Sequence, residues 1–213
     1  MWDSLIIKNP LNTALILSII TIVYNVAEGI VSVIFGINDQ ILALLGFGVD
    51  SFVEVISGVG ILHMILRMKN SSTENRDKFE STALRITGFG FYILTAGLVI
   101  GSIINVIEKN NPSTTLAGIV ISAFSIITMY LLMKAKFKVG ETMNSDAVIA
   151  DAHCTKTCFN LSVILLLSSL LYEVSSVGYF DILGSLGIAY YAFIEGRESF
   201  EKAENNKLSC TCS

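Results

Sequence analysis

Six apolar runs with short polar connections make up most of this chain of 213 residues. An α-helix needs about 20 apolar residues to cross the hydrocarbon core of a bilayer, and most of the runs reach that length. They cover residues 11–35, 41–66, 86–107, 113–133, 146–172 and 180–200. The sixth is the weakest, because its uninterrupted apolar part extends only from Ile182 to Ile194. Hydrophobic residues form 53% of the chain, which excludes an ordinary soluble domain. We therefore expect an all-α membrane protein, a bundle of six transmembrane helices.

Basic residues lie mainly in alternate connections of the predicted bundle. They are Lys8; Arg67, Lys69, Arg76, Lys78 and Arg85; Lys134, Lys136 and Lys138; and Arg197, Lys202 and Lys207. By the positive-inside rule these connections and both termini are cytoplasmic, which requires an even number of spans. We predict a transmembrane domain over residues 1–200 and a short cytoplasmic tail over 201–213. The predicted location is the prokaryotic cell (inner) membrane.

Two acidic residues lie one helical turn apart near the middle of the second run. Asp50 and Glu54 occur in GFGVDSFVEVISG, and residues four apart share a helix face. Carboxylates at membrane depth are costly and indicate a functional site; the alternative is a structural pair bonded to neighbouring helices. Because two ionised carboxylates repel each other, an empty site would hold protons that a bound cation displaces.

Two cysteines repeat this spacing in the fifth run. Cys154 and Cys158 share a helix face with Asp151, whereas Lys156 lies about 200° around the helix from Cys154. Their parallel Cβ vectors disfavour an intrahelical disulfide, so two thiolates facing one metal ion are the better interpretation. The alternative is a pair of small buried hydrophobic side chains.

The two pairs together predict a metal site with four ligands, Asp50, Glu54, Cys154 and Cys158. Two carboxylates and two thiolates suit a borderline-to-soft divalent ion in tetrahedral geometry, zinc first and cadmium next. Magnesium and calcium prefer shells of oxygen atoms and are disfavoured.

Further polar residues are predicted beside the ligands or along the ion pathway. They are Asn25, Glu28, Asp151 and Asp181. For Glu28, structural pairing between helices is an equal alternative. Cys210 and Cys212 near the C-terminus are candidates for a relay that hands metal to or from the pore, and incidental cysteines in a flexible tail are the alternative. Because that tail faces a reducing cytoplasm, we expect no disulfide framework.

Taken together, these motifs resemble those of the cation diffusion facilitator family of metal/proton antiporters. The segment QILALLGFGVDSFVE is similar to the family's second span, which ends in Asp-x-x-x-Asp. SDAVIADAHCTKTC is similar to its fifth span, where Ser-x-Ala-x-x-x-Asp-Ala precedes His-x-x-x-Asp. Shorter likenesses are Asn25, Glu28 and Gly29 in the first span and Tyr179-Phe180-Asp181 at the start of the sixth.

By position, Asp50 and Glu54 take the second-span ligand places of that family, and Cys154 and Cys158 take the fifth-span places. Three of these four residues differ from the commonest family set. The two cysteines leave softer ions open, among them cadmium, lead, mercury and copper(I). The family's usual cytoplasmic C-terminal domain is not expected in this chain. The resemblance therefore does not imply a homodimer, although a homodimer is a possible partner state.

The resemblance implies a transporter rather than an enzyme. Metal would enter from the cytoplasm, displace protons and leave on the other side by alternating access. The expected partners are the lipid bilayer and a divalent metal ion, with protons as counter-ion, no prosthetic group and no nucleic acid. One alternative is a membrane metal sensor that binds without transport. A thiol oxidoreductase using Cys154 and Cys158 is less favoured, because no Cys-x-x-Cys motif accompanies the pair.

Overall fold

The computed structural model describes residues 10–70, 76–109, 111–144 and 146–205. Nearly all of these residues lie in six α-helices: α2 (Pro10–Asn38), α3 (Leu42–Asn70), α4 (Arg76–Glu108), α5 (Leu116–Met143), α6 (Asp146–Ser175) and α7 (Tyr179–Asn205). The predicted all-α class is confirmed. Each predicted apolar run corresponds to one helix.

Two helices extend well beyond the runs that predicted them. α4 begins at Arg76 rather than at residue 86, and α5 continues to Met143 rather than ending at residue 133. Hydropathy marks where the bilayer begins, whereas a helix continues through polar residues of good helix propensity such as lysine and glutamate. α5 ends where Asn144 takes a left-handed conformation, with φ of 48°, and its backbone N–H donates to the carbonyl oxygens of Gly140 and Glu141.

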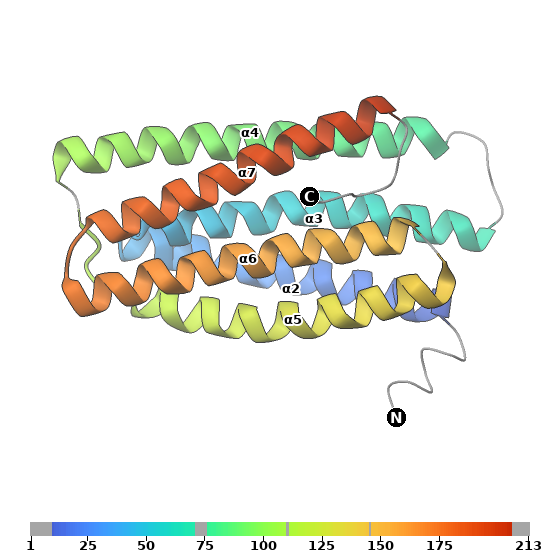
Figure 1. The fold of residues 1–213 in the computed structure, drawn as a ribbon, viewed down its shortest axis with the longest axis horizontal. Coiled ribbons are helices and arrows are strands. Elements are labelled where there is room, and N and C mark those ends of the chain that lie inside the picture. Colours follow the sequence, from blue (N-terminus) through green and yellow to red (C-terminus); the bar gives the residue numbers. More distant parts are fainter. Residues whose placement is uncertain (1–9, 71–75, 110, 145, 206–213) are drawn as a thin grey trace.

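The helices run alternately up and down along one long axis (Figure 1). One end, here called the turn end, holds the connections from α2 to α3, from α4 to α5 and from α6 to α7. The opposite end, here called the terminal end, holds the beginning of α2 and the end of α7. Both ends of the described chain therefore lie on the same side of the bundle, as an even number of crossings requires.

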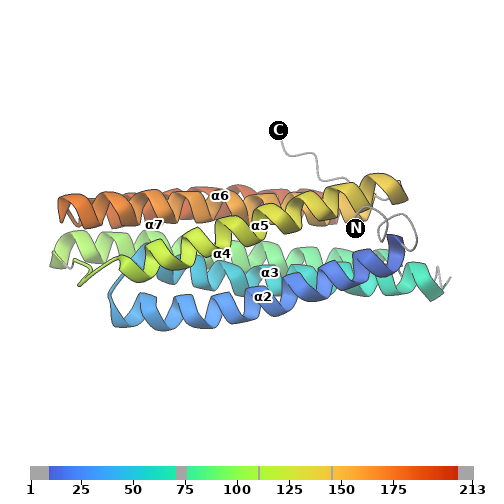
Figure 2. The ribbon, with the colours of Figure 1, turned by 90° about the horizontal axis from the view of Figure 1, so that it is seen from below.

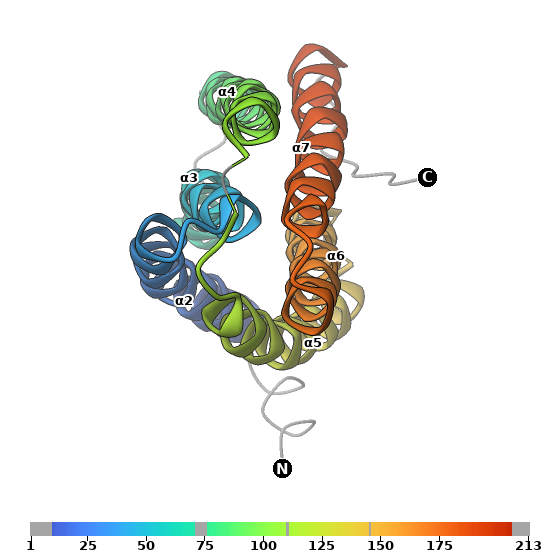
Figure 3. The same cartoon turned by 90° about the vertical axis from the view of Figure 1, so that its left-hand side faces the viewer.

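Three helix pairs have the most extensive contacts: α2 with α3, α4 with α7, and α5 with α6. Seen from the turn end, α2 and α3 lie opposite α6 and α7, with α5 closing one edge and α4 the other (Figure 3). α5 crosses obliquely between α2 and α6 (Figure 2). The bundle thus places α3 and α6, the helices with the predicted ligands, near its centre.

Five of the six helices are long and apolar enough to cross a membrane. These segments are Pro10–Asn38, Leu42–His63, Leu84–Glu108, Leu116–Met143 and Asp151–Ser175. α7 is not among them, since charged residues follow one another closely from Glu195 to the end of that helix. The sixth span stays a prediction.

α2 and α3 pack with their backbones unusually close. A Cβ atom at Gly36 would lie 2.7 Å from the backbone nitrogen of Leu45, and one at Gly48 would lie 2.9 Å from that of Val33. Small residues permit such close approach between membrane helices. The close packing brings the buried polar residues of α2, which are Thr21, Asn25, Glu28 and Ser32, against the acidic face of α3.

Two apolar clusters follow one another along the bundle. The cluster nearer the turn end joins α3, α4, α6 and α7, and includes Phe47, Val53, Leu98, Leu165 and Ile188. The cluster nearer the terminal end joins α2, α3, α5 and α6, and includes Leu17, Ile65, Met129, Val148 and Cys158. The predicted ligands on α3 and α6 lie where the two clusters meet.

Candidate metal centre

Three of the four predicted ligands come together in the structure. One ligand atom each from Asp50, Glu54 and Cys158 lies within 4.8 Å of the other two, and all three residues are buried. The four-residue spacing places both carboxylates on one face of α3, and that face meets Cys158 of α6. Ligand atoms lie about 2.0 to 2.3 Å from a bound zinc ion, so small side-chain movements suffice to bring all three onto one ion.

Two buried acceptor atoms at this place have no hydrogen-bond partner in the described part of the chain. They are Oδ1 of Asp50 and Oδ1 of Asn25. The amide nitrogen Nδ2 of Asn25 donates to Oε2 of Glu54 at 3.1 Å. A buried acceptor without a donor is costly, and a cation would satisfy it. The donor set of carboxylate, thiol and amide oxygen therefore fits a divalent metal ion as cargo.

Glu28 links α2 to α3 beside this group. Its Oε1 accepts a hydrogen bond from the hydroxyl of Tyr24 at 2.8 Å, and its Oε2 accepts one from Ser51 at 3.3 Å. Ser51 is the neighbour of Asp50 in the sequence, so Glu28 is fixed next to the ligands. The single hydroxyl hydrogen of Ser51 is shared with the carbonyl oxygen of Phe47, which lies 3.1 Å away. Structural pairing and a role in the ion pathway both stay predictions for Glu28.

Asp151 forms a buried ion pair that sequence reasoning missed. Lys136 of α5 lies 2.8 Å from Oδ1 of Asp151 and donates to Thr155 at 2.9 Å. Ser18 of α2 donates to Oδ2 of Asp151 at 3.5 Å. The lysine is 1% exposed, although its position in the sequence predicted a cytoplasmic connection. The cluster ties α2, α5 and α6 together on the terminal side of Cys158.

A signal for the buried lysine is present in the sequence. Lysines at 134, 136 and 138 alternate along α5, and residues two apart on a helix point about 200° apart. Lys134 and Lys138 therefore share the exposed face, while Lys136 points to the opposite face, inward. The same helical geometry separates Lys156 from the cysteines of α6, and Lys156 is exposed.

The other predicted site residues lie apart from the group of three. Cys154 is half-buried and is not a member of that group. Asp181 lies at the turn end, where it accepts hydrogen bonds from the backbone nitrogens of Leu42 and Ala43 at 2.9 and 3.1 Å. It caps the first turn of α3, about 12 Å from Asp50 along the helix at 1.5 Å per residue. Cys210 and Cys212 lie outside the described residues.

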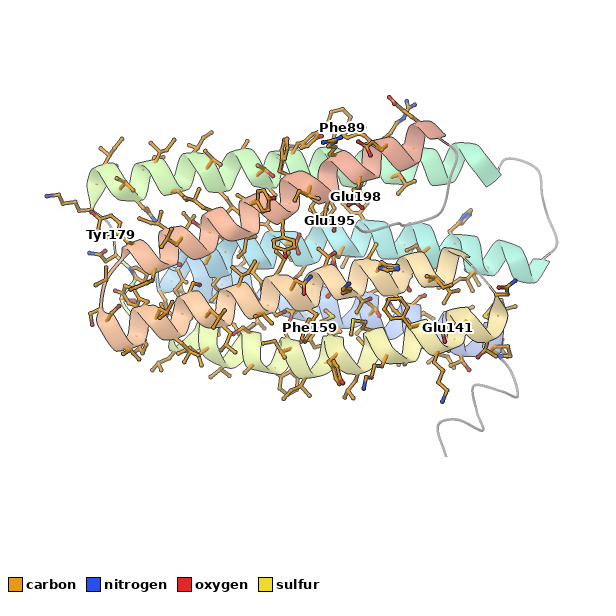
Figure 4. The ribbon with its side chains drawn as sticks, in the orientation of Figure 1. Phe89, Glu141, Phe159, Tyr179, Glu195 and Glu198 are labelled. Atoms are coloured by element: carbon orange, nitrogen blue, oxygen red, sulfur yellow. The ribbon has the colours of Figure 1, made fainter. Side chains whose placement is uncertain are left out.

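A further carboxylate near the group comes from α7. Thr157, the neighbour of Cys158 in the sequence, donates to Oε1 of Glu195 at 2.8 Å. Figure 4 shows Glu195 near the middle of the bundle, whereas Tyr179 lies at the turn end and Glu141 near the terminal end. The sequence around Glu195 gives no signal for this contact, because the charged residues that follow it are typical of a helix end.

The arrangement of apolar helices around a buried group of metal-type ligands is that of a membrane protein that handles cations. Comparison with known families agrees, since the family model of the cation efflux transmembrane domain matches residues 14–203. The chain therefore belongs to the cation efflux family. No curated protein sequence matches it. Members of this family are metal cation transporters rather than enzymes, and membership implies an integral membrane protein with a metal ion as substrate.

Proposed function

We propose that the protein exports a divalent heavy-metal cation, zinc or cadmium first, in exchange for protons. The observation that carries this proposal is the buried group of Asp50, Glu54 and Cys158, with donor atoms within 4.8 Å of one another. Such a group in a cation efflux domain is best explained as the binding site of the cargo ion. Cys154, the fourth ligand predicted from the sequence, lies outside this group, and softer ions would stay open only if its thiolate also bound the ion.

The proposed cycle uses the position of the group between the two apolar clusters. A cation arrives from the terminal end and takes the place of protons on the carboxylates and the thiol. The helices then close at that end and open at the turn end, where protons return and the ion leaves. Because the buried acidic groups hold either protons or metal, net negative charge is never left uncompensated inside the membrane.

The proposed topology has six spans, with both termini in the cytoplasm of a prokaryotic cell. The position of the two ends of the described chain on one side of the bundle supports it. α7 would be the sixth span, packed along most of its length against α4.

Transport in proteoliposomes tests this function. We expect zinc or cadmium uptake, reported by an enclosed metal-sensitive dye, to be driven by a pH gradient across the vesicle membrane and lost in Asp50→Ala. Glu141→Gln is the matched control, because Glu141 is an exposed carboxylate near the terminal end. Binding without flux would favour a metal sensor instead. A redox activity that survives Asp50→Ala would favour a thiol oxidoreductase.

A further inference from the structure

Asp50, Glu54 and Cys158 give three ligand atoms, whereas zinc and its relatives usually take four in a tetrahedron. We propose that the side-chain oxygen of Asn25 is the fourth ligand of the cargo ion, in place of the Cys154 thiolate. This inference rests on the proposed function and specifies the site further. It assigns a ligand to α2, so that three helices, α2, α3 and α6, would hold the ion between them.

The amide of Asn25 lies directly beside a predicted ligand. Asn25 is 1% exposed, and its Nδ2 donates to Oε2 of Glu54 at 3.1 Å. The amide oxygen belongs to the same small planar group, so it lies beside the carboxylate that is itself a predicted ligand. With Glu54 ionised, as it is when it binds a metal ion, the amide nitrogen must face this carboxylate, because turning the amide over would place two oxygen atoms without a proton against each other.

The amide oxygen of Asn25 also needs a partner. Oδ1 of Asn25 is buried and accepts no hydrogen bond in the described part of the chain, and the same holds for Oδ1 of Asp50. Two such acceptors beside one group of metal-type donors indicate a positive charge shared between them. An amide oxygen is a good neutral ligand for a divalent cation.

α2 also packs closely against α3 at this place. Gly29 lies one turn from Asn25, and a Cβ atom there would lie 3.1 Å from the backbone oxygen of Gly48 on α3. The close contact between the two helices holds Asn25 against the acidic face of α3. A ligand on such a fixed element is positioned more accurately than one on a loop.

Cys154 is placed less favourably than Asn25. It is half-buried rather than buried, and it lies outside the group of three. It is one turn from Cys158 toward the terminal end, at the level of the Lys136–Asp151 ion pair. The resulting set of two carboxylates, one thiolate and one amide oxygen is harder than a set with two thiolates. It favours zinc over mercury or copper(I).

Cadmium binding to the purified protein tests the assignment. The parent for this experiment carries Cys210→Ser and Cys212→Ser, so that tail thiols add nothing to the signal. The charge-transfer absorbance of cadmium thiolates counts the bound sulfur atoms, and competition with a chelator gives Kd. We expect one thiolate per cadmium in the parent, no change in Cys154→Ser and loss of the band in Cys158→Ser.

Two substitutions at Asn25 separate a ligand from a residue that only positions Glu54. We expect Asn25→Ala to raise Kd about tenfold or more, and Asn25→Asp to keep Kd close to that of the parent. An aspartate still offers an oxygen ligand but has no N–H to donate to Glu54. If Asn25 only positions Glu54, Asn25→Asp weakens binding as much as Asn25→Ala, and the proposal is overturned.

The proposal would also be overturned if the charge-transfer absorbance corresponded to two thiolates per cadmium in the parent and fell by half in Cys154→Ser. This outcome can be read even if the Asn25 variants do not fold. Transport is measured on the same parent. Cadmium binding with one thiolate but without flux would overturn the transport function and support the ligand assignment. No cadmium binding to a parent of native helix content would overturn both.

Discussion

Asp50 and Glu54 place two carboxylates one turn apart in the interior of the bundle. Both residues are buried, and the nearby Glu28 adds a third acidic side chain. Such a constellation destabilises the empty protein whenever more than one carboxylate is ionised. The carboxylates that would bind the metal ion therefore lower the stability of the metal-free protein.

Asp50→Asn tests this effect at the residue scale. The amide removes a negative charge while keeping the shape of the side chain, so we expect weaker metal binding by about tenfold or more. We also expect a higher Tm of the metal-free variant, because its folded state no longer has to take up a proton at residue 50 or keep two neighbouring carboxylates ionised. Isothermal titration with zinc and thermal unfolding in detergent measure the two effects, with Glu141→Gln as an exposed control. A lower Tm of the metal-free variant would contradict the reasoning.

At the scale of elements, α5 and α6 are joined by charge as well as by apolar packing. Lys136 lies 2.8 Å from Asp151, and their side chains are 1% and 8% exposed. Removing one partner of a buried pair leaves an uncompensated charge, which costs about 3–5 kcal/mol, whereas replacing both is often close to neutral.

We therefore expect Lys136→Met to destabilise the bundle by about 3–5 kcal/mol and a further Asp151→Asn to restore most of that loss. Asparagine at 151 keeps an acceptor for Ser18. Denaturant-induced unfolding in mixed micelles gives the free energies of unfolding. Lys138→Met, on the exposed face of α5, is the control and should change stability little. If the double variant loses as much free energy of unfolding as Lys136→Met alone, the two side chains are not energetically coupled.

At the scale of the whole molecule, the sequence predicts what depends on one helix alone. Helix number and class follow from hydropathy, and Asp50 with Glu54 follows from four-residue spacing. Spacing did not show that Cys158 joins these carboxylates without Cys154, or that Asn25 contacts Glu54. These contacts depend on how far each helix is rotated and shifted against its neighbours. Side-chain packing between helices determines this rotation and shift. The periodicity within one helix gives no information about them.

The topology of the whole bundle depends on α7, whose apolar part is the shortest. Its close packing against α4 argues that it crosses the membrane with the others, so that its charged end lies on the same side as the beginning of α2. Single cysteines in a variant without native cysteines test this with a thiol reagent that does not cross membranes. We expect Asp39→Cys, at the turn end, to react in intact cells. Glu141→Cys and Glu204→Cys, both exposed, should react only after permeabilisation. Labelling of residue 204 in intact cells, with residue 141 protected, would mean that α7 does not cross.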